Sequence, residues 1–187
     1  MALMAINEKL RPYHLIYEEK EFLRYVKNGI IVDSCVLLEL IKWFNNINIP
    51  EEEKEAFKQI ERFLSLQCTK YITPHIIAEL SNLINKEIAH TGTDGFSNCI
   101  ELIKIKLTEE EGYKEKSIYK DDVLELNESK KLGITDAGII LLSKEDNKII
   151  LTKDSVLDEE CKYKQNLPCL NLDDIKSLVL TLQCFKK

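Results

Sequence analysis

The sequence contains little of what several protein classes require. Its 187 residues include six glycines and four prolines, which excludes a collagen-like or linker-dominated chain. No stretch approaches the roughly 18 apolar residues of a membrane-spanning helix, because charged residues interrupt every candidate run. The first residues show neither the basic start nor the long apolar segment of a signal peptide. These absences predict a protein without a membrane segment, located in the cytoplasm.

Two further shortages concern zinc and nucleic acid. The six cysteines form no CxxC pair and have no histidine at zinc spacing, so we expect small buried side chains rather than a structural zinc site. Among 26 basic residues only three are arginine, and the net charge is −6. This balance argues against holding nucleic acid by bulk electrostatic attraction. It is compatible with an enzyme that contacts a few phosphates through metal ions.

The apolar content of 44% is sufficient for one sizeable core. Short β-branched or apolar runs predict strands at 29–33, 71–73, 148–152 and 168–170, with helical patterns between them. Alternation of this kind predicts a three-layer α/β/α fold with a central, mostly parallel sheet. We expect residues 1–28 to be an N-terminal extension that packs on a single domain formed by residues 29–187.

Local signals also predict where helices begin and end. Thr73 followed by Pro74 is typical of an N-cap and a first helical turn, and Gly133 is typical of a C-cap. Thr135 is predicted to cap a buried helix over 136–143. The remaining predictions are a loop at 90–95, a helix over 119–132 and a last helix over 172–182.

Four acidic residues stand at the ends of these predicted elements. Asp33 ends the first strand, and Asp154 lies two residues beyond the strand 148–152. Glu79 lies in the second turn of the helix that follows strand 71–73, and Asp136 lies in the first turn of the helix that precedes strand 148–152. Ligands of parallel sheets bind beyond the carboxyl ends of the strands. We therefore expect these four carboxylates to meet in one crevice.

Carboxylates gathered in this way repel one another, and their pKa values rise unless a cation is present. Mg²⁺ or Mn²⁺ suits such a site, because these ions take oxygen ligands and commonly share them with substrate phosphate. A metal there activates water and neutralises charge during phosphoryl displacement. The sequence therefore predicts a metal-dependent phosphodiester hydrolase.

Each acid also has a structural interpretation. Asp33 and Asp154 are suited to helix capping, and Asp136 beside Thr135 is suited to the positive end of a helix. Glu79 has no such role, because it lies beyond the first turn in the largely apolar segment 77–80. Lys153, beside Asp154, is a candidate phosphate contact, with a solvated lysine as the default interpretation.

Four blocks of the sequence, which span roughly residues 29–170, carry a resemblance to a known family. They are GIIVDSCVLLELI around Asp33, TPHIIAELSNLI around Glu79, LGITDAGIILLS around Asp136 and IILTKDSVL around Asp154. In order and chemistry they resemble the PIN domain, the Mg²⁺- or Mn²⁺-dependent nuclease fold of VapC-type toxins and several RNA-processing factors.

The resemblance implies that Asp33, Glu79, Asp136 and Asp154 are both metal ligands and catalytic residues. It places supporting hydroxyl groups at Ser34 and Thr152. It further implies an RNA substrate, products with 5′-phosphate and 3′-hydroxyl ends, a homodimer and, for a toxin, an antitoxin protein as partner.

Two other functions are alternatives to the metal-dependent nuclease. A non-catalytic PIN-like scaffold that binds RNA or protein would keep the acids without using them. A phosphoryl-transfer enzyme of the haloacid-dehalogenase or receiver type needs a second aspartate beside the strand-end aspartate. Ser34 and Cys35 follow Asp33 instead, which argues against this second rival.

Overall fold

The computed structural model describes residues 27–45, 49–64, 68–88, 93–105, 107 and 113–177. The predicted N-terminal extension therefore lies outside the described residues, apart from the helical residues 27–28 at its end. The predicted last helix is present over 172–177, and its remaining residues also lie outside the described ranges.

Within the described residues the strands form one five-stranded parallel sheet in the order β3-β2-β1-β4-β5. The strands are β1 (Ile30–Val32), β2 (Lys70–Ile72), β3 (Tyr113–Glu115), β4 (Ile149–Thr152) and β5 (Cys169–Asn171). The helices and helical turns are α3 (Ser34–Phe44), η2 (Glu51–Glu53), α4 (Lys54–Leu64), α5 (Pro74–Glu87), α6 (Thr93–Lys104), α7 (Lys120–Glu125), α8 (Ser129–Leu132), α9 (Ile134–Asp146), α10 (Ser155–Glu159) and η5 (Glu160–Lys164).

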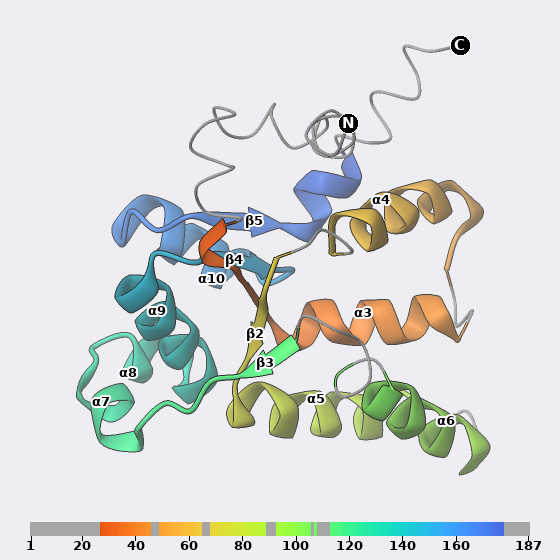
Figure 1. Cartoon of the computed structure of the whole chain (residues 1–187), viewed down its shortest axis with the longest axis horizontal. Helices are drawn as coiled ribbons and strands as arrows, with labels where there is room; N and C mark the ends of the chain where they lie inside the picture. Colours follow the sequence, from red (N-terminus) through yellow and green to blue (C-terminus); the bar gives the residue numbers. More distant parts are fainter. Residues whose placement is uncertain are drawn as a thin grey trace.

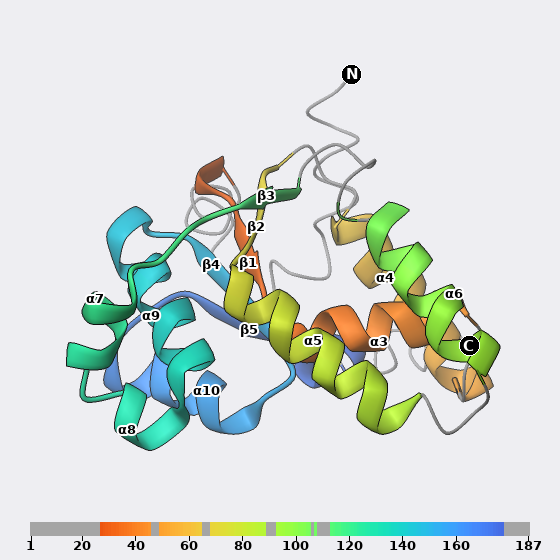
Figure 2. The same cartoon turned by 90° about the horizontal axis from the view of Figure 1, so that it is seen from below.

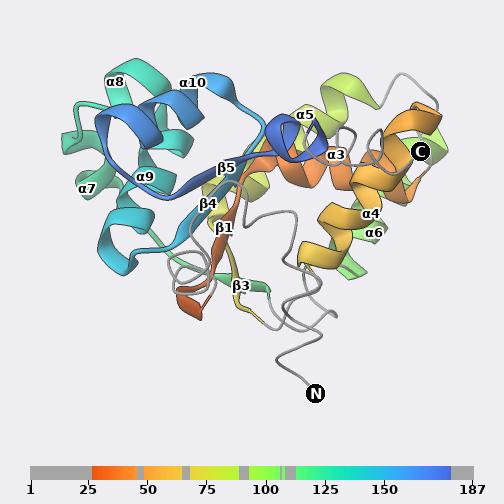
Figure 3. The ribbon, with the colours of Figure 1, turned by 90° about the horizontal axis from the view of Figure 1, so that it is seen from above.

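Helices cover both faces of this sheet. Figure 1 shows α3 to α6 on one side of the strands and α7 to α10 on the other, and the view from above in Figure 3 shows the same division. Seen from below, α5 starts near the ends of the strands and runs in front of α3 (Figure 2). The predicted three-layer α/β/α fold is confirmed.

The central strands form because their side chains are apolar and can be buried on both faces of a parallel sheet. Every residue of β1 and β4 is buried. The next helices begin where the sequence predicts: Thr73 Oγ1 accepts a hydrogen bond from the Ile76 N–H at 3.2 Å, and Pro74 occupies the first turn of α5. Gly133 ends α8 with a φ of 106°, as its predicted C-cap role requires.

Several predicted boundaries are wrong. The strand β3 lies in a region without a strand signal, because two of its three side chains are exposed and no apolar run marks it. Helix α9 begins at Ile134 after Gly133, so Thr135 lies inside the helix rather than capping it. The predicted loop 90–95 is wrong over 93–95, which belong to α6, because short polar residues suit helix starts as well as turns.

The predicted helix 119–132 is divided into α7 and α8. Leu126 ends α7 in an extended conformation, and its carbonyl accepts a hydrogen bond from the Ser129 hydroxyl at 2.7 Å. This bond gives the backbone an alternative to a continuous helix.

The order of the strands decides where a ligand would bind. From β1 the chain continues outward through β2 and β3, and it then returns to the other side of β1 to form β4 and β5. The direction therefore changes between β1 and β4, which register Val32 against Leu151 at their carboxyl ends. A crevice outside the carboxyl ends at such a point is the expected ligand site of an open parallel sheet.

Candidate metal centre

Asp33, directly after β1, is the most firmly held of the four predicted site acids. Only 3% of its surface is exposed, and it caps α3. Its Oδ1 accepts hydrogen bonds from the Ser34 N–H at 2.6 Å and the Ser34 hydroxyl at 3.1 Å. Its Oδ2 accepts from the Thr152 hydroxyl at 2.6 Å and from the Cys35 thiol at 2.9 Å. Four donors therefore hold this buried carboxylate in one orientation.

Thr152 connects the ends of β1 and β4. While its hydroxyl donates to Asp33, its Oγ1 accepts a hydrogen bond from the Asp154 N–H at 2.9 Å. Asp154 is exposed, and its Oδ1 caps α10 by accepting from the Val156 N–H at 2.7 Å and the Leu157 N–H at 3.1 Å. One hydroxyl thus positions two of the predicted site acids, and both acids also have the capping roles considered for them.

The other two acids have few partners. Glu79 is on α5, and its Oε2 atom is buried without a hydrogen-bond partner in the described part of the chain. Asp136 is in the first turn of α9. A buried carboxylate oxygen without a donor is unfavourable, by about 1–3 kcal/mol or more for a charged group. Such an atom calls for a ligand or a proton.

Electrostatics link all four acids. Burial, and then the charges of Asp33, Asp154 and Glu79, raise the pKa of Asp136 from its ordinary 3.8 to about 7. All four influences act in the same direction, so repulsion among these carboxylates is not relieved at Asp136. This is the behaviour expected of like charges that repel one another.

The oxygen donors fit a hard divalent cation in their chemistry, and the unpartnered Glu79 Oε2 and the raised pKa of Asp136 favour one. The side chains do not form a finished cage. Among the residues that the structure describes, no three or more His, Cys, Asp or Glu side chains lie close enough together to hold a metal ion. The structure therefore brings the four acids within electrostatic reach of one another but not into ligating positions.

Cys35 is a neighbour of this centre that the sequence did not reveal, because it was interpreted as a small buried side chain. It is half-buried, and its Sγ accepts a hydrogen bond from the Lys153 N–H at 3.1 Å while the thiol donates to Asp33. Burial, followed by the charge and hydrogen bond of Asp33, raises the pKa of the Cys35 thiol. Cys35 is therefore a neutral hydrogen-bonding group. Its position two residues after Asp33 was the available signal.

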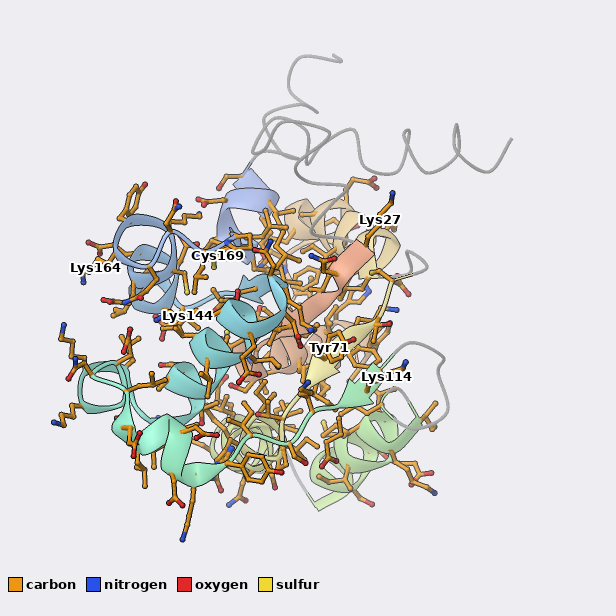
Figure 4. All side chains as sticks on the ribbon, turned by 60° about the vertical axis from the view of Figure 1, so that its left-hand side comes forward. Lys27, Tyr71, Lys114, Lys144, Lys164 and Cys169 are labelled. Atoms are coloured by element: carbon orange, nitrogen blue, oxygen red, sulfur yellow. The ribbon has the colours of Figure 1, made fainter. Side chains whose placement is uncertain are left out.

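Lys153, next to Asp154, is already paired with an acid, and so is Lys144 in the last turn of α9. Lys153 Nζ pairs with Glu39 Oε1 at 3.3 Å rather than standing free for a phosphate. Lys144, which Figure 4 labels on α9, pairs with Glu128 at 3.2 Å. Glu39 was not singled out from the sequence, since a lone acid within a helix carries no distinguishing signal.

Comparison with known proteins shows the fold. No known family matches the sequence, and no curated protein matches it either. The structure is similar to the crystal structure of PAE2754 from Pyrobaculum aerophilum, with a TM-score of 0.50 and 16% sequence identity over 82% of this chain and 96% of that one. No helix in the described ranges is long and apolar enough to cross a membrane. The chain is thus similar to a solved protein in its α/β/α architecture.

Proposed function

We propose that this protein is a divalent-metal-dependent endoribonuclease whose centre is formed by Asp33, Glu79, Asp136 and Asp154. The observation that carries the proposal is the electrostatic coupling of Asp136 to three carboxylates from other elements, which together with burial raises its pKa to about 7. Asp33 and Asp154 follow β1 and β4, and Glu79 and Asp136 lie in the first two turns of α5 and α9. Such an arrangement favours a cation-binding crevice over four independent helix caps.

The acids would have different roles in this centre, because their hydrogen bonds differ. Asp33 is held by Ser34, Cys35 and Thr152, so it would supply a fixed carboxylate. Within the described ranges, Glu79 Oε2 has no hydrogen-bond partner, and it would adjust around the cation together with Asp136. When bound, Mg²⁺ or Mn²⁺ supplies an activated water and neutralises charge on the phosphate. A cation bound beside Asp136 would lower its raised pKa again, because a positive charge favours the ionised carboxylate.

The choice of RNA as substrate rests on the resemblance to PIN domains. The net charge of −6 supports holding the substrate through the metal centre rather than through a broad basic surface. The same resemblance makes a toxin role a further part of the proposal. Growth arrest on expression of the wild type, and normal growth with Asp33→Ala, would be the expected result for a toxin.

The first test is binding of Mn²⁺ measured by titration calorimetry, combined with cleavage of a labelled single-stranded RNA. We expect the wild type to bind Mn²⁺ and to cleave. Asp136→Asn should weaken binding at least roughly tenfold and abolish cleavage, because it removes a charge from the centre of the group. Asp122→Asn, on the exposed start of α7, is the matched control and should change neither. Absence of Mn²⁺ binding to the wild type would overturn the proposal.

A non-catalytic scaffold is the second candidate, and the capping bonds of Asp33 and Asp154 favour it, because these give both acids a structural use. A scaffold would retain RNA or protein binding with no dependence on Mn²⁺. Asp136→Asn would then leave that binding unchanged.

A further inference from the structure

One face of α3 holds Lys153 at two points. The Lys153 N–H donates to Cys35 Sγ at 3.1 Å, and Lys153 Nζ pairs with Glu39 Oε1 at 3.3 Å. Cys35 and Glu39 are one helical turn apart on α3, so their side chains lie on the same face. The residue immediately before Asp154 is therefore fixed in both its backbone and its ammonium group.

Glu39 is a shared partner of three lysines. Its side chain is 12% exposed, and it pairs with Lys153 at 3.3 Å, Lys42 at 3.4 Å and Lys176 at 3.8 Å. Burial opposes its ionisation, but these lysines together hold the pKa of Glu39 below its ordinary value. It is therefore a stable anion beside the acidic crevice.

The three lysines differ in what else they can pair with. Lys42 also pairs with Glu87, and Lys176 also pairs with Glu53 at 2.8 Å. For Lys153, Glu39 is the one acid with which it forms an ion pair in the described ranges of the chain. Glu39 thus decides where the ammonium group of Lys153 lies.

Without Glu39 the ammonium would lose its partner, while the backbone of Lys153 would stay beside the acidic centre. Cys35 Sγ joins the Lys153 N–H to Asp33 Oδ2, so the backbone of Lys153 is two hydrogen bonds from the acidic centre. Lysine carries its charge on a flexible four-carbon stem. An ammonium among these acids would relieve their repulsion and occupy the place of a cation.

We propose that Glu39 is a positioning residue that keeps the Lys153 ammonium out of the acidic centre, so that a divalent ion rather than Lys153 neutralises the four carboxylates. This inference rests on the proposed metal binding. It assigns to Glu39 a role that acts only through Lys153, and a double-mutant cycle can therefore test it.

The experiment measures Mn²⁺ affinity by titration calorimetry for the wild type, Glu39→Gln, Lys153→Met and the double variant. We expect Glu39→Gln to weaken Mn²⁺ binding roughly tenfold, since a unit charge a few ångströms away acts on this scale. In the Lys153→Met background, Glu39→Gln should have an effect within about twofold. Glu53→Gln is the matched control: it removes the same charge from a partner of Lys176 and should leave Mn²⁺ affinity unchanged.

The outcomes separate this inference from the proposed function. If the wild type binds no Mn²⁺, both are overturned. If the wild type binds Mn²⁺ and Glu39→Gln matches it, or weakens binding equally with and without Lys153, the positioning role is wrong while the metal centre stands. If Glu39→Gln weakens Mn²⁺ binding when Lys153 is present but not in the Lys153→Met background, the positioning role is supported. A merely structural contribution of Glu39 would persist without Lys153.

Discussion

Charged side chains at the two ends of the same parallel sheet have opposite electrostatic surroundings. At the amino end, Lys148 is 4% exposed, pairs with Asp146 and lies with its Nζ 4.4 Å from the ring centroid of Tyr71. At the carboxyl end, Asp136 faces three other carboxylates. Charges at the first end are paired within the protein, whereas those at the second end repel one another. Pairing serves stability, and unrelieved repulsion is typical of a site that awaits a ligand.

The amino end is also tightly packed. Gly29 has a φ of 104°, and a Cβ built on it would lie 2.5 Å from Tyr71 Cε2 and 2.7 Å from the Thr69 carbonyl oxygen. Tyr71, labelled in Figure 4, packs in this region. This close approach of backbone and ring leaves no room for a side chain.

The largest predicted loss of stability comes from a substitution that disrupts the packing at the amino end of the sheet. Gly29→Ala should lower the free energy of unfolding by about 3 kcal/mol or more, because steric overlap adds to backbone strain. Gly133→Ala is the control: its φ is 106°, but nothing lies within 4 Å of the built Cβ, so it should show the strain alone. Urea unfolding of both variants measures the difference. Equal losses would show that packing at Gly29 contributes nothing.

A smaller loss is expected from breaking the charge pairing at the amino end. The hydrogen bond from Lys148 holds the pKa of Asp146 below its ordinary 3.8. The stability from this pair is therefore present above pH 3.8 and is lost as the pH falls through the lower native value. Asp146→Asn should cost about 1–2 kcal/mol at pH 7, since Lys148 stays buried while Asp146 is partly exposed. Urea unfolding at pH 7 and at pH 3 checks whether the loss disappears in acid.

At the carboxyl end, the pH dependence of the free energy of unfolding should have the opposite sign. The native pKa of Asp136 is raised to about 7, so the folded protein holds a proton that the unfolded chain releases above 3.8. Stability from this group is therefore greatest below pH 3.8 and falls as the pH rises towards 7. Without divalent metal, Asp136→Asn should raise stability at pH 8 by about 1 kcal/mol after solvent screening. A stability gain that is equal at pH 3 and pH 8 would contradict the repulsion.

The smallest predicted effect is a change in the pKa of Asp136 when another acid of the centre is replaced. Glu79 is the weakest of the three carboxylate influences on Asp136. Glu79→Gln should lower the pKa of Asp136 by less than about one unit, because burial and two acids remain. Carbon NMR titration of the Asp136 carboxyl group without metal provides the measurement. Asp33→Asn, which removes a stronger influence, should lower that pKa further.

Much of the fold was predictable because the signals are local. The apolar runs of β1 and β4 and the Thr73-Pro74 start of α5 each depend on a few neighbouring residues. The strand β3 was not predictable, because Tyr113–Glu115 joins the edge of the sheet by pairing with β2 and buries little of itself. A half-exposed edge strand leaves no apolar pattern in the sequence.

For the acidic centre, the sequence predicted which acids belong to it but not how they are held. Asp33, Glu79, Asp136 and Asp154 stand at element ends that a parallel sheet brings to one side, and Asp136 is coupled to the other three. The Thr152 hydroxyl that serves both Asp33 and Asp154 was anticipated only as a supporting group, and the thiol of Cys35 was not. Their roles depend on the alignment of β1 with β4, across more than a hundred residues of chain.

The sequence by itself therefore determined the alternation of elements, the direction of the sheet and the identity of the candidate acids, since these follow from local periodicity and from residue types at element ends. Only the tertiary structure decided which charges are compensated. It paired Lys148 with Asp146 and Lys153 with Glu39, and among the residues that the structure describes it left Glu79 Oε2 without a hydrogen-bond partner. The physical reason is that charge compensation depends on distances and burial between residues remote in sequence, which no local pattern encodes.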